Sequence, residues 1–127
     1  MKYLFVPYEI AIVAKSQGFN EPCLAYYERQ QLSNIVEYSN SKLRQENLIN
    51  GQCLAPTYQQ LFDWFREKHD RYLCYTYRND DGQWLIWFER VSSEDVEYTI
   101  HEHSSYYEAL NKALEEAFKV INIEDVK

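Results

Sequence analysis

The sequence is poor in the small residues that form ligand-binding loops. Its 127 residues include three glycines, three prolines and one methionine. Gly18, Gly51 and Gly82 stand far apart, and each is explained by a turn or by the end of a helix. A loop that cradles phosphate groups needs several glycines close together. The sequence therefore predicts no nucleotide-binding loop of this kind.

Cysteines and long apolar runs are also scarce. Cys23, Cys53 and Cys74 form no Cys-x-x-Cys pair, which argues against a disulfide framework and a structural zinc site. We expect reduced, mostly buried thiols, and none lies beside a histidine as a catalytic nucleophile requires. Residues 1–7 are too short an apolar run for a signal peptide, and no run is long enough to cross a bilayer. These absences favour a cytoplasmic protein with no membrane partner and no cofactor.

Acidic residues outnumber basic ones by 20 to 13, which gives the chain a net charge of −7. The excess lies in residues 55–127, with fifteen acidic and eight basic residues, whereas residues 1–54 have five of each. Nucleic acids and anionic membranes are bound by clusters of Lys and Arg, so the charge argues against both partners. An acidic inhibitor that imitates nucleic-acid charge is an alternative, although most carboxylates are interspersed with Lys or Arg, as on an ordinary surface.

The clearest pattern is a helix over Ala55–His69, with Pro56 in its first turn. Four apolar residues fall at i, i+3, i+4 and i+7, which is one stripe of a helix: Tyr58, Leu61, Phe62 and Phe65. Trp64 lies at the edge of this stripe, where it either widens the core contact or touches a partner. With 17% aromatic residues, the chain favours a core made of sheet plus helix.

The strongest hairpin signal follows this helix. Strands over Tyr72–Arg78 and Gln83–Glu89 flank the turn sequence Asn-Asp-Asp-Gly of residues 79–82. This register pairs three residues of each strand on one face, which we expect to be the core: Tyr77 with Trp84, Tyr75 with Ile86 and Leu73 with Phe88.

The opposite face of the hairpin is too aromatic to be covered by water alone. It carries Tyr72, Cys74 and Thr76 against Leu85, Trp87 and Glu89. Either the N-terminal segment or a second copy of the chain should cover it. The predicted interface residues are therefore Trp87, Leu85, Tyr72, Cys74 and, from the helix, Trp64.

The remaining C-terminal pattern completes an α+β fold. Residues 96–101 alternate as a third strand, Ser105 and Glu108 match a capping box, and an apolar stripe predicts a long helix over residues 106–121. Residues 55–127 then form an α-β-β-β-α core, an antiparallel three-stranded meander with both helices on one face. This core and the preceding residues 1–54 make one domain, residues 1–127.

The N-terminal segment has weaker signals. A short helix is expected over Pro7–Gly18, with Gly18 as its left-handed terminal residue. Cys23–Glu28 is a candidate strand, Ile35–Tyr38 is its candidate partner, and residues 40–50 are the best linker candidate.

Residues that could carry chemistry are few. His101 and His103 share one face of an extended chain and could bind a divalent metal as a minor enzyme would, but no third ligand is evident. Two polar residues at a strand end explain them better, and His69 suits the C-terminal end of its helix. The α-β-β-β-α order is also that of double-stranded RNA-binding domains, but these need a basic cluster where this chain has residues 104–108, Ser-Ser-Tyr-Tyr-Glu.

Three stretches together carry a resemblance: residues 18–27 (GFNEPCLAYY), residues 55–69 (APTYQQLFDWFREKH) and residues 106–119 (YYEALNKALEEAFK). Their combination resembles a group of small uncharacterised proteins found in prophage-like and mobile-element regions of anaerobic gut bacteria. The resemblance covers most of the chain and implies a setting but no catalytic residue. We therefore expect a small non-enzymatic accessory or interaction protein. Its partner is a protein, and a second copy of the chain, in a homodimer, is one candidate.

Overall fold

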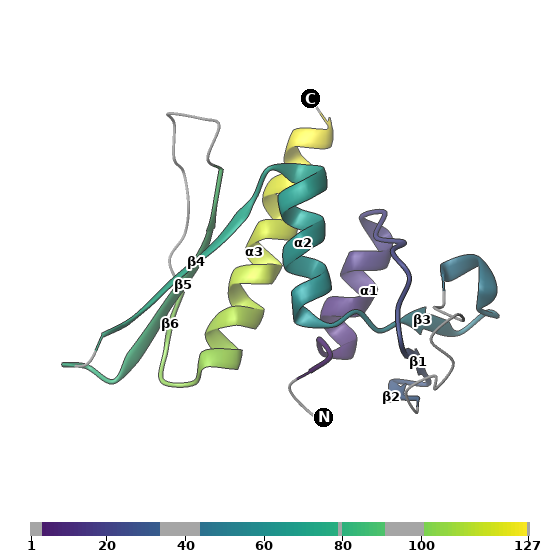
Figure 1. Cartoon of the computed structure of the whole chain (residues 1–127), viewed down its shortest axis with the longest axis horizontal. Helices are drawn as coiled ribbons and strands as arrows, with labels where there is room; N and C mark the ends of the chain where they lie inside the picture. The colour runs from purple at the N-terminus through teal and green to yellow at the C-terminus, as the bar shows by residue number, and fades with distance from the viewer. Residues whose placement is uncertain (1–3, 34–43, 79, 91–100, 127) are drawn as a thin grey trace. The chain divides into compact units, whose positions relative to one another are not determined.

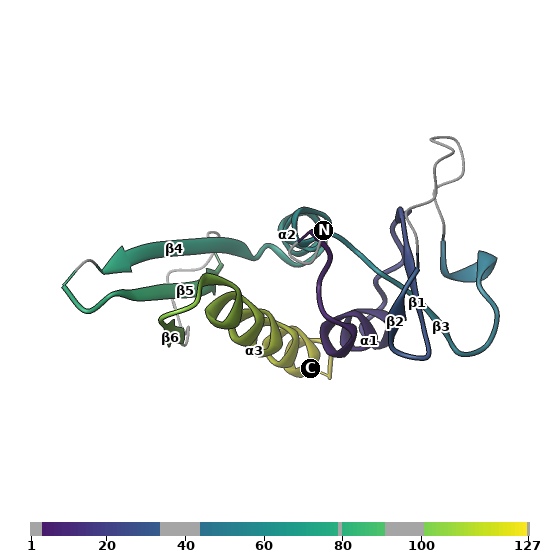
Figure 2. The same cartoon turned by 90° about the horizontal axis from the view of Figure 1, so that it is seen from below.

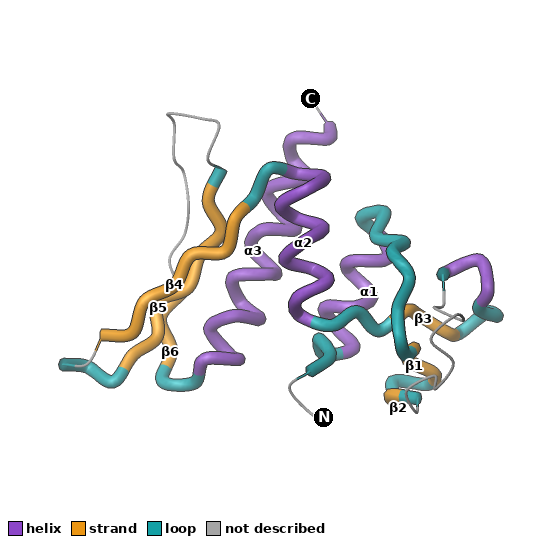
Figure 3. Tube along the Cα trace, in the orientation of Figure 1, coloured by secondary structure: helices purple, strands orange, loops and turns teal. Residues whose placement is uncertain are grey.

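The computed structural model describes residues 4–33, 44–78, 80–90 and 101–126, and for His101 and residues 122–126 it describes the backbone only. The chain forms two compact units, Met1–Leu61 and Phe62–Lys127. The division falls inside a helix, whereas the sequence pattern placed the change between segments at residues 54 and 55. Helices and strands are both present in each unit (Figure 3), so the fold is of the α+β class as predicted.

The first unit opens with helix α1, Tyr8–Ser16, which ends as the sequence predicts. Gly18 adopts a left-handed φ of +95°, the N–H of Phe19 donates to the carbonyl of Ala14 at 2.9 Å, and the N–H of Gly18 donates to that of Lys15 at 3.2 Å. These two bonds form a Schellman cap, and the Phe19 side chain after it is buried. Pro7 is the N-cap residue just before the helix.

The small sheet of the first unit has the order β2-β1-β3, all antiparallel. Its strands are β1, Tyr26–Glu28, β2, Gln31–Leu32, and β3, Gln52–Leu54. The candidate strand at Cys23–Glu28 is therefore shorter than predicted, and its neighbours are β2 and β3. The predicted partner, Ile35–Tyr38, lies outside the described residues. Arg29 and Gln30 make the β1–β2 turn at φ of +51° and +66°. Arg and Gln rarely adopt this left-handed conformation, so their presence in the sequence does not predict the turn.

Part of the predicted linker is anchored. Residues 34–43 lie outside the described part of the chain, but Gln45–Asn47 form a 3-10 turn, η1. Asn20 holds this turn, because its Oδ1 accepts a hydrogen bond from the backbone N–H of Gln45 at 2.8 Å and its Nδ2 donates to Glu46 at 3.0 Å. The pKa of Glu46 is lowered by the bond from Asn20. Polar side chains make the contacts that hold this turn, so no apolar pattern in the sequence indicates them.

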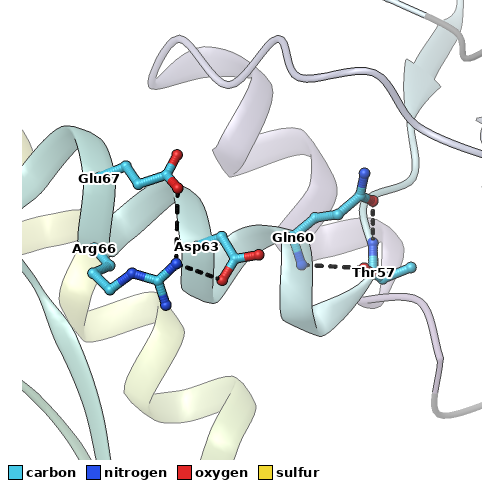
Figure 4. A network of polar contacts seen from close by, with 5 residues as sticks. All are labelled: Thr57, Gln60, Asp63, Arg66 and Glu67. Carbon is cyan, nitrogen blue, oxygen red and sulfur yellow. Dashed lines mark hydrogen bonds and ion pairs between the residues drawn. The ribbon is translucent and has the colours of Figure 1, made fainter.

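Helix α2, Tyr58–His69, begins two residues later than Pro56. Pro56 is buried in extended chain and its carbonyl accepts the N–H of Val6, so the placement of Pro56 in the first helical turn is wrong. Thr57 and Gln60 instead form a capping box, in which each side chain accepts the backbone N–H of the other at 3.1 and 2.9 Å (Figure 4). Further along, Arg66 pairs with Asp63 at 3.0 Å and with Glu67 at 3.7 Å.

The second unit contains the predicted hairpin in its predicted register. Strands β4, Tyr72–Arg78, and β5, Gln83–Glu89, pair antiparallel with Tyr77 opposite Trp84, and β6, His101–His103, pairs with the other edge of β5. The predicted third strand at residues 96–101 is described only from His101 onward. Helix α3, Tyr106–Val126, then lies along the sheet (Figures 1 and 2).

Helix α3 and the part of α2 that belongs to the second unit pack on the same face of this sheet. From α2, Phe65 lies with its ring centroid 5.2 Å from Phe88 and 4.8 Å from Phe118 of α3. Ile86 and Phe88 of β5 are buried there. The apolar residues of α3 that face the sheet are buried too: Ala109, Leu110, Ala113, Leu114, Ala117, Phe118 and Ile121. The α-β-β-β-α meander with two helices on one face is therefore confirmed.

The predicted core face is only half covered. Tyr75 and Tyr77 lie on this face but are 58% and 45% exposed. In Figure 1 the tip of the β4–β5 hairpin stands away from α3. Ile86 and Phe88, which lie further from this tip than Trp84, are buried. The assignment of Tyr75 and Tyr77 to the core is wrong.

Candidate functional site

The second face of the hairpin carries a small polar cluster. Cys74 lies opposite Trp87, and Tyr72 lies opposite Glu89. The carboxylate of Glu89 accepts hydrogen bonds from the Cys74 thiol and from Nε1 of the Trp87 indole, each at 3.5 Å. Tyr72, Cys74, Trp87 and Glu89 are all half-buried. We call these four residues the Glu89 cluster.

The Glu89 cluster makes Cys74 a poor nucleophile. Burial raises the pKa of this thiol, and the hydrogen bond and negative charge of Glu89 raise it further. The thiolate is the reactive form of cysteine, so at neutral pH Cys74 is a protonated donor. Its role in this site is to pack and to donate a hydrogen bond.

The other two thiols are equally unreactive. Burial raises the pKa of Cys23 to about 12, with a smaller effect from nearby Cys53, and burial also raises the pKa of Cys53. Cys53 donates to the carbonyl of Ala11 at 3.5 Å. All three cysteines are free thiols, as the sequence predicts.

Two predicted interface residues are buried within the chain. Trp64 packs its ring 6.0 Å from Phe118 and 5.1 Å from Phe65, which fits the alternative in which it widens the core contact of α2. Leu85 is also buried. Of the predicted interface residues, those that offer surface on the second face are Tyr72, Cys74 and Trp87.

A larger exposed aromatic group lies on the first face, beyond the helices. Trp84 is its centre, with Tyr77 at 4.9 Å, Tyr106 of α3 at 5.0 Å and Tyr75 at 6.3 Å between ring centroids. We call Tyr75, Tyr77, Trp84 and Tyr106 the aromatic platform. Burial, and to a lesser extent its neighbours Tyr107 and Tyr75, raise the pKa of Tyr106. The sequence revealed these four rings but assigned three of them to a covered face.

His103 has a structural explanation beside this platform. Its Nδ1 accepts the backbone N–H of Ser105 at 3.0 Å, and its Nε2 pairs with the carboxylate of Glu108. The N–H of Glu108 donates to Ser105 Oγ at 3.5 Å, so His103 stands between the two residues of the predicted capping box.

This arrangement leaves little support for a metal at His101 and His103. Both ring nitrogens of His103 already have partners, and the side chain of His101 lies outside the described part of the structure. Among the described residues, no group of three His, Cys, Asp or Glu side chains is placed to hold a metal ion. The ring of His69 packs 4.5 Å from that of Trp64 at the end of α2.

Two residues near the start of β4 were not anticipated. Arg71 is a buried charged residue, and its backbone N–H donates to the carbonyl of Phe65 at 3.0 Å. Asp70 before it adopts a φ of +53°, which ends α2 without a glycine. No sequence signal marks either feature, because Arg usually lies at the surface and a left-handed Asp is uncommon.

Within the described residues, no helix is long and apolar enough to span a bilayer. Comparison of the chain with protein-family models, curated proteins and solved structures gives no match.

Proposed function

We propose that the chain is a small, non-enzymatic, cytoplasmic accessory protein of phage or mobile-element type that self-associates through the sheet β4–β5–β6. The protein partner in this proposal is a second copy of the chain, in a homodimer. Three protonated thiols and a histidine committed to a helix cap support a role in binding over a role in catalysis. The resemblance of residues 18–27, 55–69 and 106–119 supports the phage-like setting.

The observation that carries the proposal is the character of β4. Among the strands of the described residues it forms an edge, in the order β4-β5-β6. It is seven residues long, contains neither Lys nor Pro, and exposes Tyr75, Thr76 and Tyr77. Edge strands usually carry Lys or Pro, because an edge without them pairs readily with another chain. A long aromatic edge without this protection is a natural place for a second strand.

Antiparallel pairing of β4 with β4 of a second copy satisfies the symmetry of a closed dimer. The same strand contributes on both sides, so the contact is isologous and stops at two copies. Pairing near the middle of β4 extends the second face, with its Tyr72 and Cys74, across both copies. It also places each Thr76 close to its counterpart.

Sedimentation of charge variants tests this proposal. The wild type should have a sedimentation mass twice the 15.3 kDa of one chain. Thr76→Lys should be monomeric, because two like charges would meet across the paired strands. Trp87→Lys should weaken association less, since Trp87 lies one strand away from the edge. The matched control is Ile12→Lys, which adds the same charge at an exposed apolar residue of α1.

A wild type that stays monomeric at high concentration contradicts the proposal. So does a Thr76→Lys variant that dimerises as the wild type does. Thr76 is exposed, so its variant should keep the folded structure, which circular dichroism checks.

The acidic inhibitor is the second candidate function. It rests on the net charge of −7, and it requires carboxylates in a continuous row at phosphate spacing. On α2 the described carboxylates do not form such a row, because Arg66 pairs with both Asp63 and Glu67. Arg78 likewise pairs with Asp81 and Glu102. Mixed charges of this kind favour the interaction protein.

A further inference from the structure

The aromatic platform is a packed cluster and not an open cage. Trp84 touches Tyr77 and Tyr106, and Tyr75 touches both Trp84 and Tyr106, with centroid separations of 4.9 to 6.3 Å. Rings at these separations are in direct contact, which leaves no space between them for a ligand group. What they offer is their outer faces, above all those of Tyr75 and Tyr77, which are 58% and 45% exposed. A ligand for such a surface must be flat enough to stack.

The surroundings of the platform are negative. Residues 75–84 and 102–109 contain one basic residue, Arg78, against four acidic ones: Asp80, Asp81, Glu102 and Glu108. Arg78 is held between two of these carboxylates, at 3.1 Å from Asp81 and 3.9 Å from Glu102. The partner of Glu108 is His103. A net negative charge therefore remains beside the exposed rings.

From these two features we propose that the platform binds the arginine side chain of a basic peptide segment. The guanidinium group is planar, stacks on aromatic faces and carries the charge that complements this end of the sheet. A nucleobase would stack equally well, but its phosphates would meet the same carboxylates. The inference uses the first face of the sheet and does not depend on self-association.

The test is a titration with three fluorescently labelled peptides of the same length, each a Gly/Ser chain with three arginines, three lysines or three citrullines. At about 0.15 M salt, where long-range attraction between charges is screened, the arginine peptide should bind about threefold tighter than the lysine peptide. The citrulline peptide keeps the flat group but lacks the charge, so it should bind more weakly than either.

Matched variants locate the site. Tyr77→Leu keeps an apolar side chain but removes the ring, and it should weaken the arginine peptide about threefold while leaving the lysine peptide almost unchanged. Glu108→Gln should weaken both peptides, whereas Glu115→Gln, which removes an equally exposed carboxylate further along α3, should weaken neither. The unfolding midpoint of Tyr77→Leu, an exposed position, checks that the fold is retained.

Three results overturn the inference. Equal binding of the arginine and lysine peptides shows only general attraction of a basic peptide to an acidic chain. Unchanged arginine binding by Tyr77→Leu places the peptide elsewhere. A neutral oligosaccharide such as cellohexaose that binds the wild type tighter than the arginine peptide, and is lost in Tyr77→Leu, assigns the platform to sugars.

Discussion

At the scale of single residues, His103 shows how a capping motif can be assembled differently from its sequence signature. Ser105 and Glu108 predict a reciprocal pair, and one half of it forms, from the N–H of Glu108 to Ser105 Oγ. The N–H of Ser105 is instead satisfied by His103 Nδ1, whose Nε2 reaches Glu108. The sequence motif located the start of α3 correctly, but it could not show that a residue of the preceding strand would enter the cap.

His103→Ala should therefore destabilise the protein. Removal of the ring leaves the N–H of Ser105 without its acceptor at the start of α3, which costs about 1 kcal/mol of unfolding free energy. Urea denaturation measures the change. Ser104→Ala alters an exposed neighbour in the same loop and serves as the control. A variant of His103 as stable as the control would show that the ring contributes nothing to the cap.

Burial raises the pKa of Cys74, and Glu89 raises it further. Its carboxylate accepts the thiol hydrogen and raises the pKa of Cys74, so Glu89→Gln should lower that pKa while an amide oxygen still accepts the bond. The thiolate fraction near pH 8 then increases, and alkylation by iodoacetamide should proceed several-fold faster, which mass spectrometry measures. Buried Cys23 and Cys53 are internal controls, since neither should react in the folded protein.

Residue patterns did not show which side chains from distant parts of the chain would meet. Trp64 stood at the edge of a helical stripe, and the sequence left open whether it packs or binds. Its ring contacts its neighbour Phe65 and also Phe118 of α3, which lies more than forty residues further along the chain. No local pattern contains the second contact. The same holds for Arg71, whose burial has no local signal.

At the scale of elements, the hairpin was predictable because its turn and its alternation agree. The segment Asn-Asp-Asp-Gly and the two aromatic strands predicted the full register from Tyr72–Glu89 to Arg78–Gln83. The strands β2 and β3 were missed, since two and three residues are too few for alternation to show. The sequence also did not predict how much of the β4–β5 face the helices cover, because this depends on packing between distant segments.

Because the helices cover only part of this sheet face, substitutions at its two ends should differ strongly in the unfolding free energy that they cost. Phe88 is buried against Phe65, so Phe88→Ala should cost about 3–5 kcal/mol of unfolding free energy. Tyr77→Ala, on the same face but beyond the helices, should cost about 1 kcal/mol or less. Chemical denaturation of the two variants measures both. Equal losses would mean that the whole face is core, as the sequence alone suggested.

At the scale of the whole molecule, the chain forms two compact units, Met1–Leu61 and Phe62–Lys127. The single domain over residues 1–127 stays a prediction. Sequence could not place that division because it falls inside α2, whose apolar stripe is continuous from Tyr58 to Phe65. The sequence could not predict the function for a related reason. A binding surface consists of side chains that the fold leaves exposed, and the sequence alone does not show which these are.

The central claim is that β4 is an open edge to which a second copy adds its own β4. Hydrogen–deuterium exchange of the backbone N–H groups of Tyr72–Arg78, measured at low and high protein concentration, tests it most directly. Exchange should slow in β4 as concentration rises, because its outward N–H groups gain partners, and should stay constant in β1 and β3. Exchange in β4 that is independent of concentration, in a sample that sedimentation shows to be dimeric, would contradict the claim.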